Sequence, residues 1–387
     1  MISSRQSRLD SERTSYDKFN DLRNFSFLLS HAAVKWRVLE TLIPSLATRQ
    51  PLSAAEVRAA VESLTDEKIP APVKADFLIA LARKGETPAE IAAFAAALRE
   101  KSVVPPIEKN WRESREILDL VGTGGDRSGT FNISTTAAIL CAAAGVAVAK
   151  HGNRAVTSRA GSADVLEALG IRIDLTPEAA ARSLREQNFA FFFAPNFHPA
   201  FRHIAAARKL CAERGQRTIF NFLGPLLNPA RPSAMLVGVP RAELCEPLAK
   251  VLPSLGVRRA MVATGKIHDG GGTAICVDEL STLGDNFVAE FYHERGFNVS
   301  TLSLENFPLQ PARLADWLGG DKFQNAAITR RILRGEDRGP KRDAVLLNAG
   351  AGLLVAGTVK SLAAGWELAG ETIDAGAAAA KLAELAG

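Results

Sequence analysis

The sequence predicts an α/β protein in which a small helical domain precedes a larger domain built on a mostly parallel central sheet. Two features of the chain predict this fold class. From Val38 to about Lys101, apolar residues recur every three or four positions, as they do in helices; beyond that stretch, short strand-like runs alternate with helical ones. With 387 residues, 47% of them hydrophobic and 23% charged, the chain can bury proper cores in two domains. We expect an N-terminal extension over 1–34, a helical domain over 35–113 completed by a segment near 205–230, and an α/β domain over 114–387.

The N-terminal helices have recognisable starts and a recognisable end. Ser53 and Thr87 are typical N-cap residues, and Pro88 suits the first turn of a helix. The Pro105-Pro106 pair is expected to end a group of about four helices.

The second part of the chain contains strand-like runs. Five are expected as strands of the sheet, and a shorter one precedes an acidic pair: 116–121, 146–150, 189–195, 233–239, 258–265 and 273–277. In such sheets ligands bind where the strands end, at their carboxyl edge. The Ala- and Gly-rich C-terminal part is expected to form closely packed helices.

Composition excludes few classes of function. The four cysteines form no CxxC pair, which favours buried thiols over zinc ligands or disulfides and fits a reducing, cytoplasmic setting. The N-terminus lacks the apolar core of a signal peptide, and the longest apolar runs are too short for a membrane span. The net charge of +5 permits an anionic ligand or nucleic acid but does not choose between them.

The stretch LVGTGGDRSGTFNISTT, residues 120–136, joins a predicted strand to a predicted helix. Bare backbone amides and the helix dipole make such a loop an anion-binding site. No lysine follows its last glycine, as a P-loop requires, and Arg127 stands where a dinucleotide fingerprint needs glycine. The stretch therefore predicts an anion site of another kind.

A second loop, KHGNRAVTSRAGS, follows the next predicted strand. Between Arg127 and Ala163 the chain has no Asp or Glu, and its cations there are Arg127, Lys150, Arg154 and Arg159. If the two strands are neighbours, the loops form one concave surface for several phosphate groups. Polyphosphate sites usually hold magnesium on carboxylate oxygens, which makes the adjacent pair Asp278 and Glu279 a candidate metal site.

Several long motifs in series resemble the anthranilate phosphoribosyltransferase family. They are GTGGD (122–126), TFNISTTAA (130–138), KHGNRAVTS (150–158), GSADVLEALG (161–170), FAPNFHPAFRH (193–203), RTIFNFLGPLLNP (217–229) and DE (278–279). Their order and spacing are those of the family, and weaker similarity extends from about Val38 to Leu385.

The resemblance implies a homodimeric, cytoplasmic enzyme of tryptophan biosynthesis with the nucleoside phosphorylase/phosphoribosyltransferase type of fold. It implies magnesium as the cofactor and two small-molecule substrates, anthranilate and 5-phosphoribosyl 1-pyrophosphate, with no membrane or nucleic acid as partner. The amine of anthranilate displaces pyrophosphate, a reaction that needs positioning and charge neutralisation rather than a covalent nucleophile. No residue is therefore assigned as a covalent catalyst.

The resemblance also implies roles residue by residue. Phosphoribosyl pyrophosphate would be bound by Gly122, Gly125, Asp126, Thr130, Asn132, Ile133, Ser134, Thr135, Lys150, His151, Gly152, Asn153, Arg154, Ala155, Val156, Thr157, Ser158 and Ser162. Anthranilate would contact Gly122, Asn153 and Arg208, the last through its carboxylate. Magnesium would be held by Ser134, Asp278 and Glu279.

Two segments depart from the family's pattern, and two rival functions remain open. The segment before Asp278, ATGKIHDGGGTAICV, is longer than the family's usual HGxGL, and RKLCAERGQRT is longer than the usual turn. The rivals are a nucleic-acid-binding relative of the same fold without transferase activity and a nucleoside phosphorylase. His198 and His203, five residues apart, are poorly spaced for a shared metal and are expected to order local structure or line the aromatic site.

Overall fold

The computed structural model describes residues 37–155, 159–267 and 275–387. The predicted extension over 1–34 lies outside the described residues. By its internal contacts the chain forms two compact units. One consists of the described residues up to Gly85 together with Arg202–Thr218, and the other consists of Glu86–Phe201 and Ile219–Gly387. The sequence placed the domain boundary at 113 and the returning segment at 205–230, whereas by contacts the first unit ends earlier and takes in a slightly different segment.

The first unit is helical. It contains helical residues 37–47, α2 (Ala54–Thr65), α3 (Ala71–Lys84) and α10 (Ala205–Glu213), which packs on α3. Ser53 caps α2 as expected, since its hydroxyl accepts from the Glu56 amide while the Glu56 carboxylate accepts from the Ser53 amide. Lys74 ties the returning segment to the helices by donating to the carbonyls of Asp66 and His203.

The second unit is built on an eight-stranded sheet with the order β3-β2-β1-β4-β5-β7-β8 and with β6 paired to β5. The strands are β1 (Ile117–Gly122), β2 (Ala147–Gly152), β3 (Phe189–Phe193), β4 (Ala234–Gly238), β5 (Arg259–Ile267), β6 (Ile275–Val277), β7 (Asn286–Tyr292) and β8 (Gly296–Leu302). Neighbours from β3 to β5 run parallel, and β6, β7 and β8 pair antiparallel. The predicted mostly parallel α/β sheet is confirmed, and β7 and β8 are strands that the sequence analysis did not identify.

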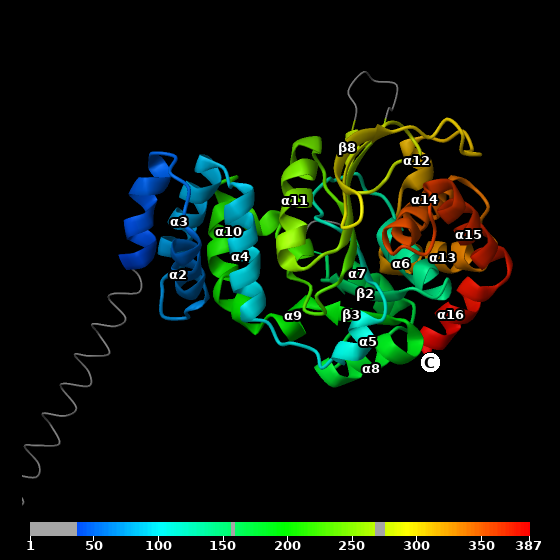
Figure 1. The fold of residues 1–387 in the computed structure, drawn as a ribbon, viewed down its shortest axis with the longest axis horizontal. Helices are drawn as coiled ribbons and strands as arrows, with labels where there is room; N and C mark the ends of the chain where they lie inside the picture. The colour runs from blue at the N-terminus through cyan, green and yellow to red at the C-terminus, as the bar shows by residue number, and fades with distance from the viewer. Residues whose placement is uncertain (1–36, 156–158, 268–274) are drawn as a thin grey trace, which may run out of the picture. The chain divides into compact units, whose positions relative to one another are not determined.

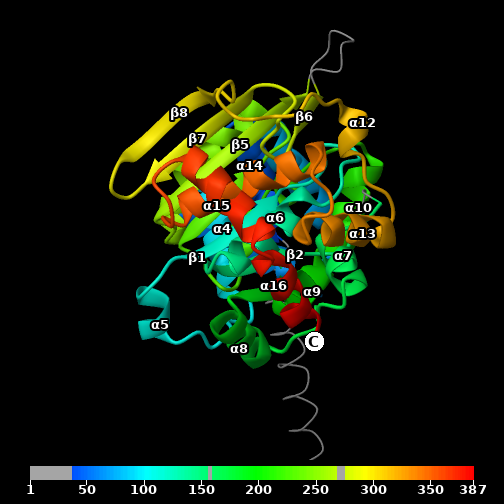
Figure 2. The same ribbon diagram turned by 90° about the vertical axis from the view of Figure 1, so that its right-hand side faces the viewer.

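Helices cover both faces of the sheet because alternate strand residues point to opposite sides. Leu118 and Leu120 of β1 belong to the larger apolar core, and Ile117 belongs to a second core on the other face. Figure 2 shows α6, α14, α15 and α16 over one face, and Figure 1 shows α11 on the other side of the sheet from α14. The helices of this unit are α4 (Pro88–Glu100), α5 (Lys109–Glu113), α6 (Ile133–Ala143), α7 (Ser162–Ala168), α8 (Pro177–Gln187), α9 (Ala194–Phe197), α11 (Cys245–Val251), α12 (Leu314–Trp317), α13 (Lys322–Leu333), α14 (Pro340–Val355), α15 (Leu362–Asp374) and α16 (Ala377–Ala386).

Two local expectations about helices are also confirmed. Thr87 caps α4 in a reciprocal capping box with Glu90, and Pro88 is the first residue of that helix. The C-terminal helices pack closely, since a side chain on Gly350 of α14 would overlap the backbone of α15 at Gly365 and Trp366. Within the described residues no helix is long and apolar enough to cross a membrane.

Candidate active site

The candidate site lies at the carboxyl end of β1, where the chain order in the sheet reverses. The connection from β1 leads through α6 to β2 on one side, and β4 pairs with β1 on the other. Such a switch point leaves a crevice beyond the strand ends, which is where ligands bind in open α/β sheets. β1 and β2 are neighbours, so the glycine loop and the loop after β2 both leave the same edge of the sheet.

Glycines make room there for the acidic pair. Gly122 and Gly238 are partners at the ends of β1 and β4, and a side chain on either would overlap Asp278. A side chain on Gly265 of β5 would overlap the backbone of Glu279. The bare ends of three adjacent strands thus let the Asp278-Glu279 backbone lie directly on the sheet edge.

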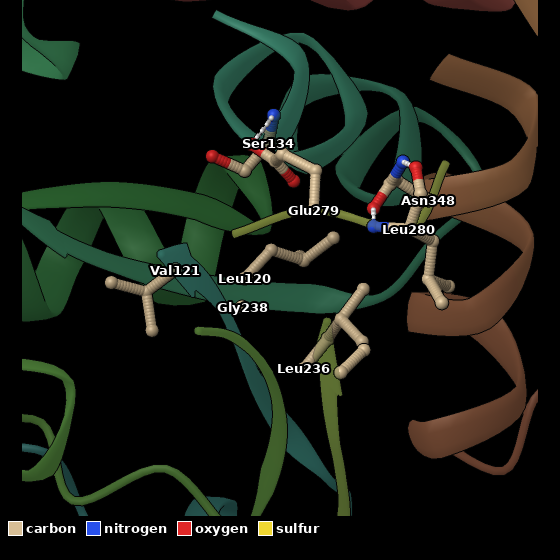
Figure 3. A pocket seen from close by; sticks show the side chains of 9 residues that line it. Leu120, Val121, Ser134, Leu236, Gly238, Glu279, Leu280 and Asn348 are labelled. Atoms are coloured by element: carbon tan, nitrogen blue, oxygen red, sulfur yellow. Dashed lines mark hydrogen bonds between the residues drawn. The ribbon is translucent and has the colours of Figure 1, made fainter. Parts of the chain in front are cut away.

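The carboxylates of this pair are anchored by backbone amides of the β1–α6 connection. Asp278 Oδ2 accepts from the Gly124 amide at 2.6 Å, and Glu279 Oε1 accepts from the Ser134 amide at 3.0 Å. Figure 3 shows Ser134 and Glu279 next to each other in a pocket that Leu120, Leu236 and Leu280 also line. The Ser134 amide belongs to the first turn of α6, where a negative charge is stabilised by the helix dipole.

The electrostatics of the pair favour a bound cation. Burial, followed by the nearby Asp126 and Glu279, raises the pKa of Asp278 well above its ordinary value. Burial likewise raises the pKa of Glu279 to about 7, against the charge of Lys150 and the hydrogen bonds from Ser134. No group of three His, Cys, Asp or Glu side chains suited to a metal occurs in the described part of the chain. Two carboxylates and a hydroxyl fit magnesium, which commonly takes one or two carboxylates and completes its shell with water and substrate phosphate.

Lys150 is buried close to the acidic pair. The residue is 2% exposed, and its ammonium donates to the Leu120 carbonyl at 2.6 Å. Burial lowers the pKa of Lys150, while the charges of Asp119 and Glu279 oppose that shift. Asp119 is itself fixed by Asn228, whose amide nitrogen donates to its Oδ2 at 2.8 Å and to the Ala149 carbonyl at 2.7 Å.

The loop after β2 is fixed by acidic residues of α7. Asp164 Oδ2 accepts from the amides of Ala155 and Gly161, both at 2.9 Å. The Arg154 guanidinium pairs with Asp164 at 3.0 Å and with Glu167 at 2.9 Å. Arg154 was expected among the residues that bind phosphoribosyl pyrophosphate, which stays a prediction; in this structure its side chain pairs with two acidic residues of α7.

His151 and His198 form a buried pair on the other side of β2 from Lys150. Their ring centroids lie 5.2 Å apart, and the His198 ring stacks on Phe201 at 5.1 Å. Burial lowers the pKa of His151 to about 3 and that of His198 to about 4, with Arg99 lowering both further. Both shifts favour the neutral form of the rings near pH 7, and the binding role expected for His151 stays a prediction.

Comparison with protein-family models finds a helical domain followed by an α/β domain, the same order as in the fold. Residues 40–102 match the helical bundle domain of the glycosyl transferase family, and residues 114–379 match the family's a/b domain. A relative from Petrotoga mobilis, an anthranilate phosphoribosyltransferase, is 46% identical over 334 residues, which is 86% of this chain and 92% of that protein. The chain belongs to the anthranilate phosphoribosyltransferase family. Another member, from Lacticaseibacillus paracasei, is 44% identical over 90% of this chain and 96% of its own length.

Solved structures of the family agree with this membership. The crystal structure of the Thermus thermophilus anthranilate phosphoribosyltransferase superposes with a TM-score of 0.78 at 42% identity, covering 89% of this chain and 98% of that one. The Saccharomyces cerevisiae enzyme in complex with phosphoribosyl pyrophosphate and Mg gives 0.77 at 26% identity, covering 90% and 96%. The same yeast enzyme has also been solved in complex with 4-fluoroanthranilate.

The structure gathers most of the residues that the family resemblance singled out. The two loops and the acidic pair lie at one edge of the sheet: Gly122, Gly125, Asp126, Thr130, Asn132, Ile133, Ser134, Thr135, Lys150, His151, Gly152, Asn153, Arg154, Ala155, Ser162, Asp278 and Glu279. Val156, Thr157 and Ser158 lie outside the described residues, as do residues 268–274 of the unusually long segment before Asp278. Arg208, expected to bind anthranilate, lies on α10 in the other compact unit.

Several residues that shape this family site were not identified from the sequence. Asp119 and Asn228 hold the backbone of β2 at Ala149 and His151. Gly238 and Gly265 make room for the acidic pair, and Asn348 holds the backbone of Leu280, the residue after that pair. A glycine at the end of a predicted strand was the available signal for Gly238 and Gly265, since such a glycine often marks a close backbone approach. Asn228 lies in the motif RTIFNFLGPLLNP, but nothing in the sequence links it to Asp119.

Proposed function

We propose that this chain transfers the phosphoribosyl group of 5-phosphoribosyl 1-pyrophosphate to the amine of anthranilate, in tryptophan biosynthesis. A bond forms between the amine nitrogen and the ribose carbon that carried pyrophosphate, pyrophosphate leaves, and the amine loses a proton. The observation that carries the proposal is the anchoring of Asp278 and Glu279 on the amides of Gly124 and Ser134, beside a buried lysine. This arrangement suits a substrate that brings several phosphate oxygens and a cation to one edge of the sheet.

The phosphate groups are proposed to bind the glycine loop and the loop after β2. The Thr130, Ser134 and Ser162 hydroxyls would serve as donors, whereas the Gly124 and Ser134 amides already hold the acidic pair. Lys150 would supply a positive charge that is already desolvated, so that it interacts strongly with charge that grows on the leaving pyrophosphate. Asp126 accepts from the Ser128 amide and hydroxyl, which holds it beside Asp278 to face a ribose hydroxyl or a bound water.

Magnesium is proposed to bind Ser134, Asp278 and Glu279, and when bound it would neutralise charge on pyrophosphate oxygens. Anthranilate is proposed to contact Gly122, Asn153 and Arg208. The homodimer, the cytoplasmic location and the assignment of phosphoribosyl pyrophosphate binding to the larger domain stay predictions from the family resemblance.

The test is pyrophosphate release from phosphoribosyl pyrophosphate by the full-length protein. Release is expected only when anthranilate and magnesium are both present. Asp278→Asn is expected to lower the rate at least about tenfold and raise the magnesium requirement, because the variant removes one of two proposed carboxylate ligands.

Three outcomes would count against the proposal or part of it. Absence of turnover, combined with tight and salt-sensitive DNA binding, would favour the nucleic-acid-binding rival. Phosphorolysis of a nucleoside without use of anthranilate would favour the phosphorylase. An unchanged magnesium dependence in Asp278→Asn would remove the metal assignment while leaving the transferase activity in place.

A further inference from the structure

We propose that Asn325 is a positioning residue for phosphoribosyl pyrophosphate, because its side-chain amide ties together the two loops that bind this substrate. The inference rests on the proposed function and adds a residue to it. Asn325 lies on α13, nearly 200 positions from the glycine loop, and no role was assigned to it from the sequence.

The segment that leads into α13 pairs directly with the glycine loop. Phe131 donates its amide to the Trp317 carbonyl, and Gly319 donates its amide to the Gly129 carbonyl, both at 3.0 Å. Thr130 and Leu318, which lie between these two hydrogen bonds, form an antiparallel bridge. A side chain on Gly319 would overlap both the Phe131 backbone and the Asn325 amide, so the two segments are in close contact. Residues 129–131, near the end of the glycine loop, therefore pair with residues 317–319 as two strands would.

A relay of two amides extends this contact to the second loop. The Gly320 amide donates to Asn325 Oδ1 at 2.7 Å, and Asn325 Nδ2 donates to Asn132 Oδ1 at 2.9 Å. Asn132 Nδ2 in turn donates to the Ala160 carbonyl at 3.3 Å. Asn132 is in the glycine loop and Ala160 in the loop after β2, so the relay runs from the α13 segment through both.

The backbone groups at the two ends fix the direction of the relay. One end is an N–H group and the other a carbonyl, so each Asn must accept on the Gly320 side and donate on the Ala160 side. Asn325 is 3% exposed, so water cannot replace a lost partner without a cost in free energy. A carboxylate at position 325 would still accept from Gly320 but would face the Asn132 oxygen. If Asn132 turned its amide to meet that carboxylate, its own oxygen would face the Ala160 carbonyl.

A second, more exposed link runs parallel to the relay. Lys322, at the start of α13, donates to Glu167 at 3.3 Å, and Glu167 holds Arg154 of the second loop. Exposed ion pairs of this kind contribute little energy, so the buried amide relay is expected to dominate the positioning.

The test compares Asn325→Asp and Asn325→Ala with the matched control Thr329→Val. Thr329 lies one turn further along α13, is fully buried, and bonds Thr136 of α6 at 2.9 Å, so it takes no part in the amide relay. Binding of phosphoribosyl pyrophosphate with magnesium is measured by calorimetry in the absence of anthranilate, and the KM of each substrate is measured in turnover. Thermal unfolding reports how far each variant is destabilised.

Both Asn325 variants are expected to weaken phosphoribosyl pyrophosphate binding about tenfold, the scale of one or two lost buried hydrogen bonds. The KM for anthranilate should change by less than about threefold, and Thr329→Val should bind phosphoribosyl pyrophosphate like the wild type even where its stability falls. Should Asn325→Ala fail to fold, Asn325→Asp carries the test. Wild-type affinity in a folded Asn325→Asp variant, or an equal loss in Thr329→Val, would overturn the inference. If the wild type binds phosphoribosyl pyrophosphate but releases no pyrophosphate, the proposed function fails while this binding comparison still decides the role of Asn325.

Discussion

At the scale of single residues, the site depends on the lack of a side chain at Gly122. This glycine was expected to touch substrate, and the structure gives it a second task, since a β-carbon there would collide with the Asp278 carboxylate. We predict that Gly122→Ala displaces Asp278 and lowers activity at least about tenfold, with an increased magnesium requirement, because overpacking of about one methyl group costs 1–3 kcal/mol. Steady-state rates over a magnesium titration measure the effect.

A matched control distinguishes this collision from a general cost of replacing glycine. Gly370 lies within α15, and the nearest group to an added β-carbon there is Arg342, at 3.9 Å. Gly370→Ala should leave activity unchanged and stabilise the protein by up to about 1 kcal/mol, since alanine is the better helix former. A Gly122→Ala variant with normal magnesium dependence would show that Asp278 adjusts without functional cost.

At the scale of elements, helix α14 supports the acidic pair from behind. Asn348 accepts from the Leu280 amide at 3.0 Å and donates to the Leu280 carbonyl at 2.9 Å, so one buried side chain fixes the residue next to Glu279 (Figure 3). We predict that Asn348→Ala destabilises the protein by about 2 kcal/mol, because it leaves two buried backbone groups unpaired. The magnesium concentration for half-maximal activity should rise several-fold. Denaturant unfolding and a magnesium titration check the two parts, and a loss of stability with an unchanged magnesium requirement would limit Asn348 to a structural role.

The elements also show how far the sequence alone predicts such a site. Strand ends, glycine loops and the acidic pair are local patterns, so the parallel sheet and the two loops at its edge were predictable. Asn325 and Asn348 act through partners 193 and 68 positions away. A buried asparagine in a helix has no local pattern that names its partner, because only the packing of distant segments brings the two together. β8 was missed for a different reason, since it is largely exposed and its sequence, GFNVSTL, lacks a buried apolar run.

At the scale of the whole molecule, the buried histidine pair ties stability to pH. The pKa of His198 is lowered to about 4 in the folded protein by burial, with Arg99 adding to the shift, whereas an exposed histidine titrates near 6.5. Above pH 6.5 the ring is neutral in both states. Below it the unfolded chain takes up a proton that the folded protein does not, so the free energy of unfolding falls as the pH falls towards 4.

We predict that His198→Gln removes about 3 kcal/mol of this acid sensitivity between pH 7 and pH 4, at about 1.4 kcal/mol per pH unit. His151 acts in the same direction, whereas Asp119, whose pKa burial raises to about 6, opposes both, since its protonation in the folded state adds stability as the pH falls from 6 towards 4. The measurement is denaturant unfolding at several pH values, compared as slopes so that any constant cost of the substitution cancels. His293→Gln, which changes an exposed ring, is the control for replacing a histidine by glutamine. An equal slope in His198→Gln and wild type would mean that the His198 ring is protonated in the folded protein as readily as in the unfolded chain.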